Sequence, residues 1–102
     1  MRRVFICSPY RGDIERNVQT ARDLCYAATR TGAAPFAPHS LYPQFLDDAM
    51  QDDRAAGINA GLAFMRVCDE LWCPKGVEPT EGMKHEIAYA KMLTLPIVEV
   101  AL

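Results

Sequence analysis

The segment 80-TEGMKHEIAYAK-91 places a carboxylate about one turn inside a predicted helix. On a helical wheel Glu86 lies beside Gly82 and Ala90, at the edge of the apolar face. A carboxylate there points towards the start of the helix, where the helix dipole favours negative charge, and Gly82 leaves space in front of it. Such a carboxylate can act as a nucleophile at the anomeric carbon of a sugar. The alternative is a solvated glutamate that only contacts a neighbouring helical turn.

A second candidate is the turn 8-SPYRGD-13, which joins a strand-like run to a helix-like run. Arg11 offers a planar guanidinium suited to phosphate, and Gly12 permits close approach of the backbone. The helix beginning at Asp13 presents free N–H groups, although the Asp13 carboxylate adds negative charge and could instead bind a ribose hydroxyl. Ordinary turn chemistry is the alternative. The candidate substrate-binding residues of this turn are Ser8, Tyr10, Arg11, Gly12 and Asp13.

A third candidate segment, 37-APHSLYPQFLDD-48, follows a short predicted strand. His39 is a candidate substrate-binding residue, with a solvated or structural histidine as the alternative. Tyr42 and Phe45 are aromatic residues in a polar loop that could close over a base. The aspartates of this region are interpreted as largely solvated, because no calcium-loop spacing is present; they are Asp47, Asp48, Asp52 and Asp53.

Alternating strand and helix patterns must position these segments. Apolar and β-branched runs predict strands at 3–7, 33–38, 69–73 and 95–100, and helical spacing predicts helices at 13–31, 54–67 and 83–93. The region 39–53 reads as a loop with one helical turn around Phe45. Gly57 and Gly61, four residues apart, indicate close packing of the second helix against a neighbour.

This order predicts a single domain, residues 1–102, of the α/β class. We expect a small doubly wound, Rossmann/flavodoxin-like sandwich with a four- to five-stranded parallel sheet. In such a sheet, ligands bind at the carboxyl ends of the strands, near the switch in strand order. The three candidate segments all follow strands, so we expect them to converge on one edge of the sheet.

Composition narrows the classes of partner. The chain of 102 residues has 11 basic and 13 acidic side chains and a formal net charge of −2, which argues against binding double-stranded nucleic acid. No apolar run is long enough to span a bilayer, so we expect no membrane partner and a cytoplasmic location. The four cysteines show neither a CxxC pair nor zinc spacing, and we interpret them as core residues. Dinucleotide and P-loop motifs are absent, and we expect neither cofactor nor metal.

Taken together, the strand ending in SPYRG, the GxxPFAPH loop, and the CDELW strand followed by EGMxxEIxYA resemble the nucleoside 2-deoxyribosyltransferase-like superfamily. The most similar group within it comprises small proteins of bacteria and phages. The resemblance covers nearly the whole chain and implies an activity on the N-glycosidic bond of a deoxynucleoside or its 5′-monophosphate. Enzymes of the superfamily use a glutamate early in a late helix as the nucleophile on C1′ of deoxyribose, and Glu86 resembles that glutamate.

The resemblance also implies further contacts with the substrate. The N-glycosidase branch has a small hydroxyl residue and a glycine shortly before the glutamate. It also has an Arg-Gly pair, preceded by a small polar residue, after the first strand, and it binds the 5′-phosphate with these groups. The matching residues here are Ser8, Arg11, Gly12, Thr80 and Gly82.

One departure from the superfamily pattern concerns the helix before the third strand. The enzymes carry an aspartate there that contacts the sugar and the leaving group, whereas this chain has Gly61, with Asn59 as the nearby polar substitute. Protonation of the leaving group would then use another residue, such as His39. Because the site of many relatives is completed by a second subunit, the resemblance also implies a homo-oligomer, a dimer or larger.

Three functions remain open. The first is an enzyme, transferase or hydrolase, that uses Glu86 on a nucleoside or nucleotide. The second is a nucleotide-binding protein without turnover, a sensor or a sponge, motivated by Gly61 in place of the aspartate. The third is a structural or interaction domain that shares only the fold.

Overall fold

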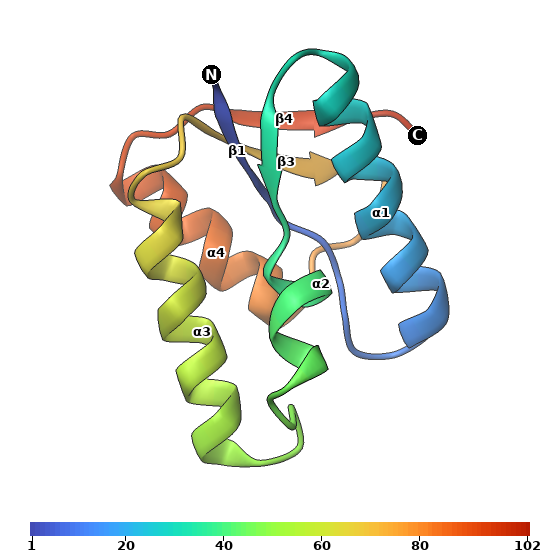
Figure 1. Cartoon of the computed structure of the whole chain (residues 1–102), viewed down its shortest axis with the longest axis vertical. Coiled ribbons are helices and arrows are strands. Elements are labelled where there is room, and N and C mark those ends of the chain that lie inside the picture. Colours follow the sequence, from blue (N-terminus) through green and yellow to red (C-terminus); the bar gives the residue numbers. More distant parts are fainter.

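Four short apolar segments form one parallel sheet in the computed structural model, which describes all residues from Met1 to Leu102 (Figure 1). The strands are β1 (Arg3–Ile6), β2 (Ala34–Phe36), β3 (Glu70–Pro74) and β4 (Ile97–Val100). Their order across the sheet is β2-β1-β3-β4, and every neighbouring pair is parallel. The predicted α/β fold is therefore confirmed, with four strands.

Helices follow each of the first three strands. They are α1 (Ile14–Arg30), α2 (Pro38–Leu41), α3 (Gln51–Met65) and α4 (Glu81–Met92), with a 3₁₀ turn at Tyr42–Gln44. The expectation of a loop over 39–53 is wrong at both ends of that segment, because α2 and the 3₁₀ turn occupy its first part and α3 begins at Gln51, three residues before the predicted helix. Pro38 is the first residue of α2, a position where the missing N–H of proline costs nothing.

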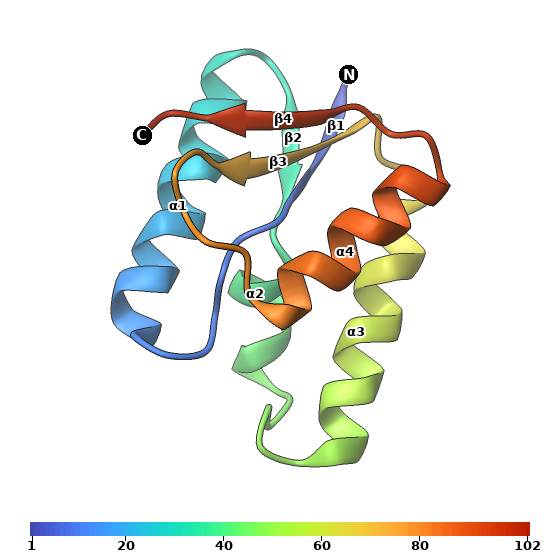
Figure 2. The same cartoon turned by 180° about the vertical axis from the view of Figure 1, so that it is seen from behind.

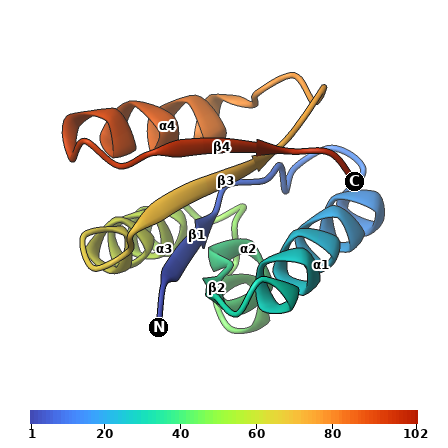
Figure 3. The same ribbon diagram turned by 90° about the horizontal axis from the view of Figure 1, so that it is seen from above.

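The strands bury side chains alternately on the two faces of the sheet, as the period of a strand requires. Val4 and Ile6 of the first strand pack with α1, while Phe5 and Cys7 pack with α3 and α4. Figure 3 shows α1 on one side of the sheet and α3 and α4 on the other, and Figure 2 shows the α3–α4 side from behind. Both sheet faces are covered, as a buried parallel sheet needs.

The cysteines are core residues, as predicted. Cys7, Cys68 and Cys73 are buried, Cys25 is half-buried, and all are free thiols. Trp72 on β3 is 7% exposed, and its indole N–H donates a hydrogen bond to Glu70 at 2.7 Å. None of the helices combines the length and the apolar character that crossing a membrane requires.

The glycines of α3 allow the segment after β2 to lie directly against this helix. A Cβ added at Gly61 would lie 3.6 Å from the Cβ of Pro38, and one added at Gly57 would lie 3.4 Å from a methyl of Leu46. The predicted close packing is confirmed. It fixes the segment that carries His39 against α3, at the same edge of the sheet where β1 and β3 end.

Candidate functional site

A cleft of about 530 Å³ opens where the segments after β1, β2 and β3 meet. Six of the residues singled out in the sequence line it: Tyr10, Arg11, His39, Thr80, Gly82 and Glu86. The strand order reverses direction between β1 and β3, so the cleft lies at the switch point of the sheet. Glu86 and Arg11, which are far apart in the chain, therefore share one cavity.

Four other predicted residues do not line the cleft. Ser8 is buried and its hydroxyl has no hydrogen-bond partner. Asp13 caps α1, because its carboxylate accepts a hydrogen bond from the N–H of Arg16 at 3.2 Å. Gly12 lies in the turn with a φ of 99°, a conformation that favours glycine, and Asn59 is exposed on α3. The geometry of the cleft gives these four no direct contact with a ligand inside it.

The start of α4 holds Glu86 at the cleft. Thr80 is the N-cap, and its hydroxyl accepts a hydrogen bond from the N–H of Met83 at 3.2 Å. Met83 is buried in the core, which fixes the rotation of this helix about its axis. Glu86 follows on the next turn, between the core and the cleft, so the helix presents its carboxyl to both.

The Glu86 carboxyl is held in an unusual electrostatic state. Its Oε1 atom is shielded from solvent and has no hydrogen-bond partner. Burial raises the pKa of Glu86 from an ordinary 4.5 to about 8, and a hydrogen bond from the Cys7 thiol opposes this shift. The protonated form of Glu86 is therefore favoured at neutral pH.

The thiol of Cys7 lies next to this carboxyl, on the side of the hydrophobic core. It is fully buried, and its sulfur lies 3.8 Å from the carbonyl oxygen of Met83. Burial, followed by the charge of Glu86, raises the pKa of the Cys7 thiol above its usual range. The thiol stays protonated, which makes it a hydrogen-bond donor and not a nucleophile.

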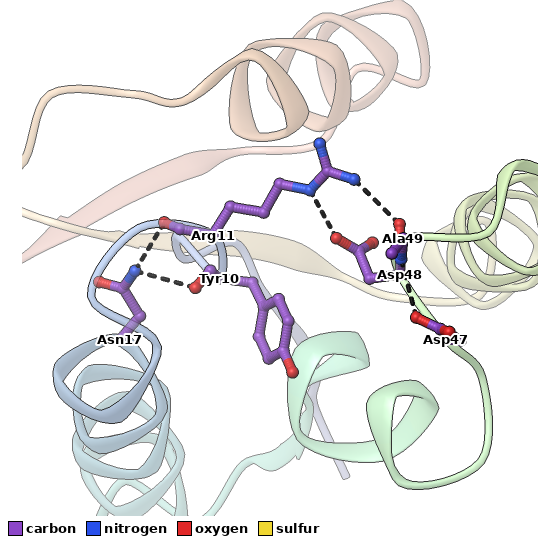
Figure 4. A network of polar contacts seen from close by, with 6 residues as sticks. All are labelled: Tyr10, Arg11, Asn17, Asp47, Asp48 and Ala49. Atoms are coloured by element: carbon purple, nitrogen blue, oxygen red, sulfur yellow. Dashed lines mark hydrogen bonds and ion pairs between the residues drawn. The ribbon is translucent and has the colours of Figure 1, made fainter.

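The turn after β1 is held by polar contacts on both sides (Figure 4). The side-chain amide of Asn17 donates hydrogen bonds to the carbonyl oxygens of Tyr10 and Arg11, each at 3.0 Å. The guanidinium of Arg11 donates from Nε to the Asp48 carboxylate and from Nη2 to the Asp48 carbonyl oxygen, the latter at 2.9 Å. Asp48 belongs to the stretch expected to be solvated, but it also lines the cleft.

His39 and Tyr10 form one wall of the cleft. Their rings stack with centroids 5.6 Å apart and planes inclined by 23°. Burial lowers the pKa of His39, and the charge of Asp48 only partly opposes the effect, so the imidazole is neutral at pH 7. Tyr42 and Phe45 contact each other edge-on and do not line this cleft, so their expected closure over a base is not supported.

Six further residues that were not predicted as site residues also line the cleft. They are Asp48, Arg54, Ile58, Leu62, Glu81 and His85. The α3 members recur every four residues, which places them on one helical face, and their spacing could have identified them. Arg54 has no ion-pair partner. Gly61 is buried against Pro38 and offers no side chain, while Asp53 of α3 lies in a smaller adjoining pocket that shares His39 and Glu86 with the cleft.

The cleft offers acid–base and hydrogen-bonding groups. Across the molecule, no three His, Cys, Asp or Glu side chains cluster as ligands for a metal ion. The groups lining the cleft include the buried carboxyl of Glu86, the neutral imidazole of His39, the guanidinium groups of Arg11 and Arg54, and the carboxylates of Asp48 and Glu81.

The fold is that of the nucleoside 2-deoxyribosyltransferases, which confirms at the level of structure the resemblance drawn from the sequence. A 2-deoxyribosyltransferase of Bacillus psychrosaccharolyticus superposes with a TM-score of 0.71 and 14% identity, over 97% of this chain and 72% of that one. A 2-deoxyribosyltransferase from Leishmania mexicana gives 0.70 and 15% identity, over 99% and 65% of the two chains.

A Clostridium botulinum CMP N-glycosidase has the same fold, with a TM-score of 0.60 and 18% identity, over 98% of this chain and 69% of that one. The chain spans about two thirds of the length of these proteins. By sequence it belongs to the family described as "Domain of unknown function (DUF7768)", whose model matches residues 2–100. No curated protein matches the sequence.

Proposed function

We propose that this protein cleaves or transfers the N-glycosidic bond of a nucleoside or a nucleoside 5′-monophosphate, with Glu86 as the nucleophile. The observation that supports this most is the Glu86 carboxyl, buried, without a partner for one oxygen, and placed at a cleft that also contains Arg11. The fold is shared with proteins named as deoxyribosyltransferases and as a CMP N-glycosidase. Each of these names describes chemistry at a glycosidic bond between a sugar and a base.

In the proposed first step, a carboxylate oxygen of Glu86 forms a bond to C1′ of the sugar. The bond from C1′ to the base nitrogen breaks, and its electron pair stays on the base. A proton must reach the departing base. In the second step water or a second base attacks C1′ and releases Glu86. Attack by water gives hydrolysis, and attack by a second base gives transfer.

His39 is the group we propose for the proton. Its imidazole is neutral at pH 7, so it first takes up the proton that Glu86 releases on ionising, and then delivers that proton to the departing base nitrogen as the bond to C1′ breaks. Its imidazole lines the cleft with Tyr10 stacked beside it, so the ring orientation is fixed. General acid assistance increases the rate by about 10²–10⁴-fold, so replacing His39 should lower kcat by a measurable amount. Its effect is expected on turnover more than on the affinity for substrate.

A second candidate function is nucleotide binding without turnover. It is favoured by the part of the cleft that α3 lines. Arg54, Ile58 and Leu62 are its lining residues there, and Gly61 offers no side chain. A protein of this kind would bind the ligand and leave it intact. We place it second, because a binding site has no need of a carboxyl whose pKa is raised to about 8.

Incubation with deoxynucleosides and with their 5′-monophosphates, each with and without a second base, tests both functions. We expect released or exchanged base from the unaltered protein and a loss of at least about 10³-fold in Glu86→Gln. Glu78→Gln is the matched control, because Glu78 is exposed and does not line the cleft. An intact ligand together with clear thermal stabilisation would establish the binding function instead.

We also propose that the chain forms a homo-oligomer. Large apolar side chains are exposed on α3, just after it, and on α4: Phe64, Val67 and Met92 are 50%, 52% and 67% exposed. A second copy would cover such surface. Sedimentation at several concentrations measures the assembly, and a single species with the mass of one chain would refute this part.

A further inference from the structure

The anion-binding edge of Arg11 is already occupied by the protein itself. Nε donates to the Asp48 carboxylate and Nη2 donates to the carbonyl oxygen of the same residue. Both residues line the cleft, and Figure 4 shows the side chain of Arg11 extending from the turn after β1 to Asp48. The two donors that point along one edge of a guanidinium are those that normally hold a phosphate or carboxylate in a bidentate manner.

The phosphate of a ligand competes with Asp48 for the hydrogen-bond donors of Arg11. To reach the same edge of Arg11, the phosphate must displace the Asp48 carboxylate or lie beside it. Displacement gives up an existing ion pair, and lying beside it places two like charges together. An uncharged 5′-hydroxyl group meets neither cost, because it can accept from the donors of Arg11 that remain free or donate to Asp48.

We propose that Asp48 is a specificity-determining residue, which lowers the affinity of the cleft for a phosphorylated ligand relative to the same ligand without phosphate. The identity of the ligand as a nucleoside rests on the proposed function. The competition between Asp48 and phosphate does not, because it depends only on the contacts of Arg11.

The size of the effect follows from the exposure of the pair. The side chains of Arg11 and Asp48 are 54% and 38% exposed, so solvent weakens both their attraction and the repulsion between Asp48 and phosphate. We therefore expect a selectivity change on the order of tenfold rather than thousands. Arg54, the other guanidinium of the cleft, is present with either residue at position 48, so its contribution cancels in the comparison.

The variant Asp48→Asn tests the proposal. It removes the charge and leaves the Asp48 carbonyl oxygen, which Arg11 also binds, so the loop stays attached. Asp47→Asn is the matched control: Asp47 is the exposed neighbour, it does not line the cleft, and its Oδ1 accepts from the N–H of Ala49 at 3.0 Å. The double variant Arg11→Ala with Asp48→Asn asks whether the effect acts through the guanidinium.

Calorimetric titration with two matched pairs of ligands gives the measurement: deoxycytidine with its 5′-monophosphate, and ribose with ribose 5-phosphate. We expect Asp48→Asn to raise the ratio of affinities, phosphorylated over unphosphorylated, by about tenfold in at least one pair. Asp47→Asn should leave the ratio within about twofold, and the double variant should lose the gain.

Three results would overturn the proposal: an unchanged ratio in Asp48→Asn, no binding of either phosphorylated ligand by that variant, or a gain that persists in the double variant. Heat of binding requires no turnover, so this proposal and the proposed function fail separately. If base is released but the ratio of affinities for phosphorylated and unphosphorylated ligands does not change in Asp48→Asn, only the proposed role of Asp48 is refuted. A change in the ratio without base release removes only the catalytic function.

Discussion

The turns that follow β1 and β3 meet at the same cleft, but their polar side chains differ in how fully they are hydrogen-bonded within the protein. After β1, the buried hydroxyl of Ser8 has no partner, but the charged and amide groups are paired within the protein: Asn17 holds two carbonyl oxygens, Asp13 caps α1, and Arg11 binds Asp48. After β3, Thr80 caps α4, but the Glu86 carboxyl keeps one oxygen without a partner.

This contrast separates a supporting turn from a reactive one. A paired buried group stabilises a fold, whereas an unpaired one costs stability and persists where a function needs it. Glu86 carries that cost, seen in its pKa of about 8, and the turn after β1 supplies a rigid opposite wall.

The largest expected effect is on stability as a function of pH. Glu86 binds its proton more tightly in the folded state, since its pKa rises from 4.5 to about 8. The raised pKa therefore stabilises the folded state fully at pH below about 4.5. This stabilisation, about 3–5 kcal/mol, is lost as the pH rises from about 4.5 to 8, and above that the contribution of Glu86 to the free energy of unfolding is constant. Urea unfolding at several pH values should show this fall in the unaltered protein and lose it in Glu86→Gln. Parallel curves for the two proteins would contradict the assigned pKa.

The pH profile of kcat/KM is the next largest effect. In the unaltered protein an ionised Glu86 and a protonated His39 are needed together, and their pH dependences oppose each other between the lowered pKa of His39 and about 8. In His39→Gln only the ionisation of Glu86 matters, so kcat/KM should rise about tenfold per pH unit below about 8 and level off above it, about 50-fold between pH 6 and 8. A fall through the same range would assign Glu86 the role of an acid. Initial rates of base release across this range, with Glu78→Gln as the reference protein, distinguish the two.

Removing the amide of Asn17 should loosen the supporting turn. Asn17→Ala leaves the carbonyl oxygens of Tyr10 and Arg11 without this donor, and we expect a loss of about 1–2 kcal/mol in the free energy of unfolding. Gln19→Ala on the exposed face of the same helix removes only a bond to Asp23 and should cost less than about 0.5 kcal/mol. Equal losses in urea unfolding would show that Asn17 does not hold the turn.

The smallest expected effects separate the two helix caps. Asp13→Ala and Thr80→Ala should each cost about 1 kcal/mol of stability, because each removes one acceptor for a free helical N–H. Thr80 lines the cleft and Asp13 does not, so Thr80→Ala should weaken ligand binding more than Asp13→Ala does. Calorimetric titration of both variants with the same nucleotide measures the difference, and equal losses of affinity would contradict the assignment of Thr80 to the cleft.

Much of the fold was predictable because its signals are local. The strand and helix periods placed four strands and three of the four helices, and the start of the first helix was placed at Asp13, which caps α1. The helix at Pro38 was missed because Pro38 was placed at the end of a predicted strand, although proline is also favoured in the first turn of a helix. Pro35 is tolerated within β2 because this strand lies at the edge of the sheet.

The candidate site was predictable only in part. Glu86 and Arg11 were found from their local patterns, and the shared cleft follows from the parallel topology. Asp48 was assigned to a solvated stretch, since nothing near it in the chain reveals its contact with a residue 37 positions away. Arg54 was passed over for the same reason: its position on the cleft depends on how α3 packs.

The amino-acid sequence by itself determined the order of strands and helices, the parallel sheet, and the place of Glu86 on the first turns of the last helix. Periods of about 2 and 3.6 residues are written into neighbouring side chains, and so they can be read without a structure. Only the tertiary structure decided that Glu86 has a raised pKa and that Arg11 binds Asp48. Burial and charge pairing depend on residues brought together from distant parts of the chain, so no local pattern records them.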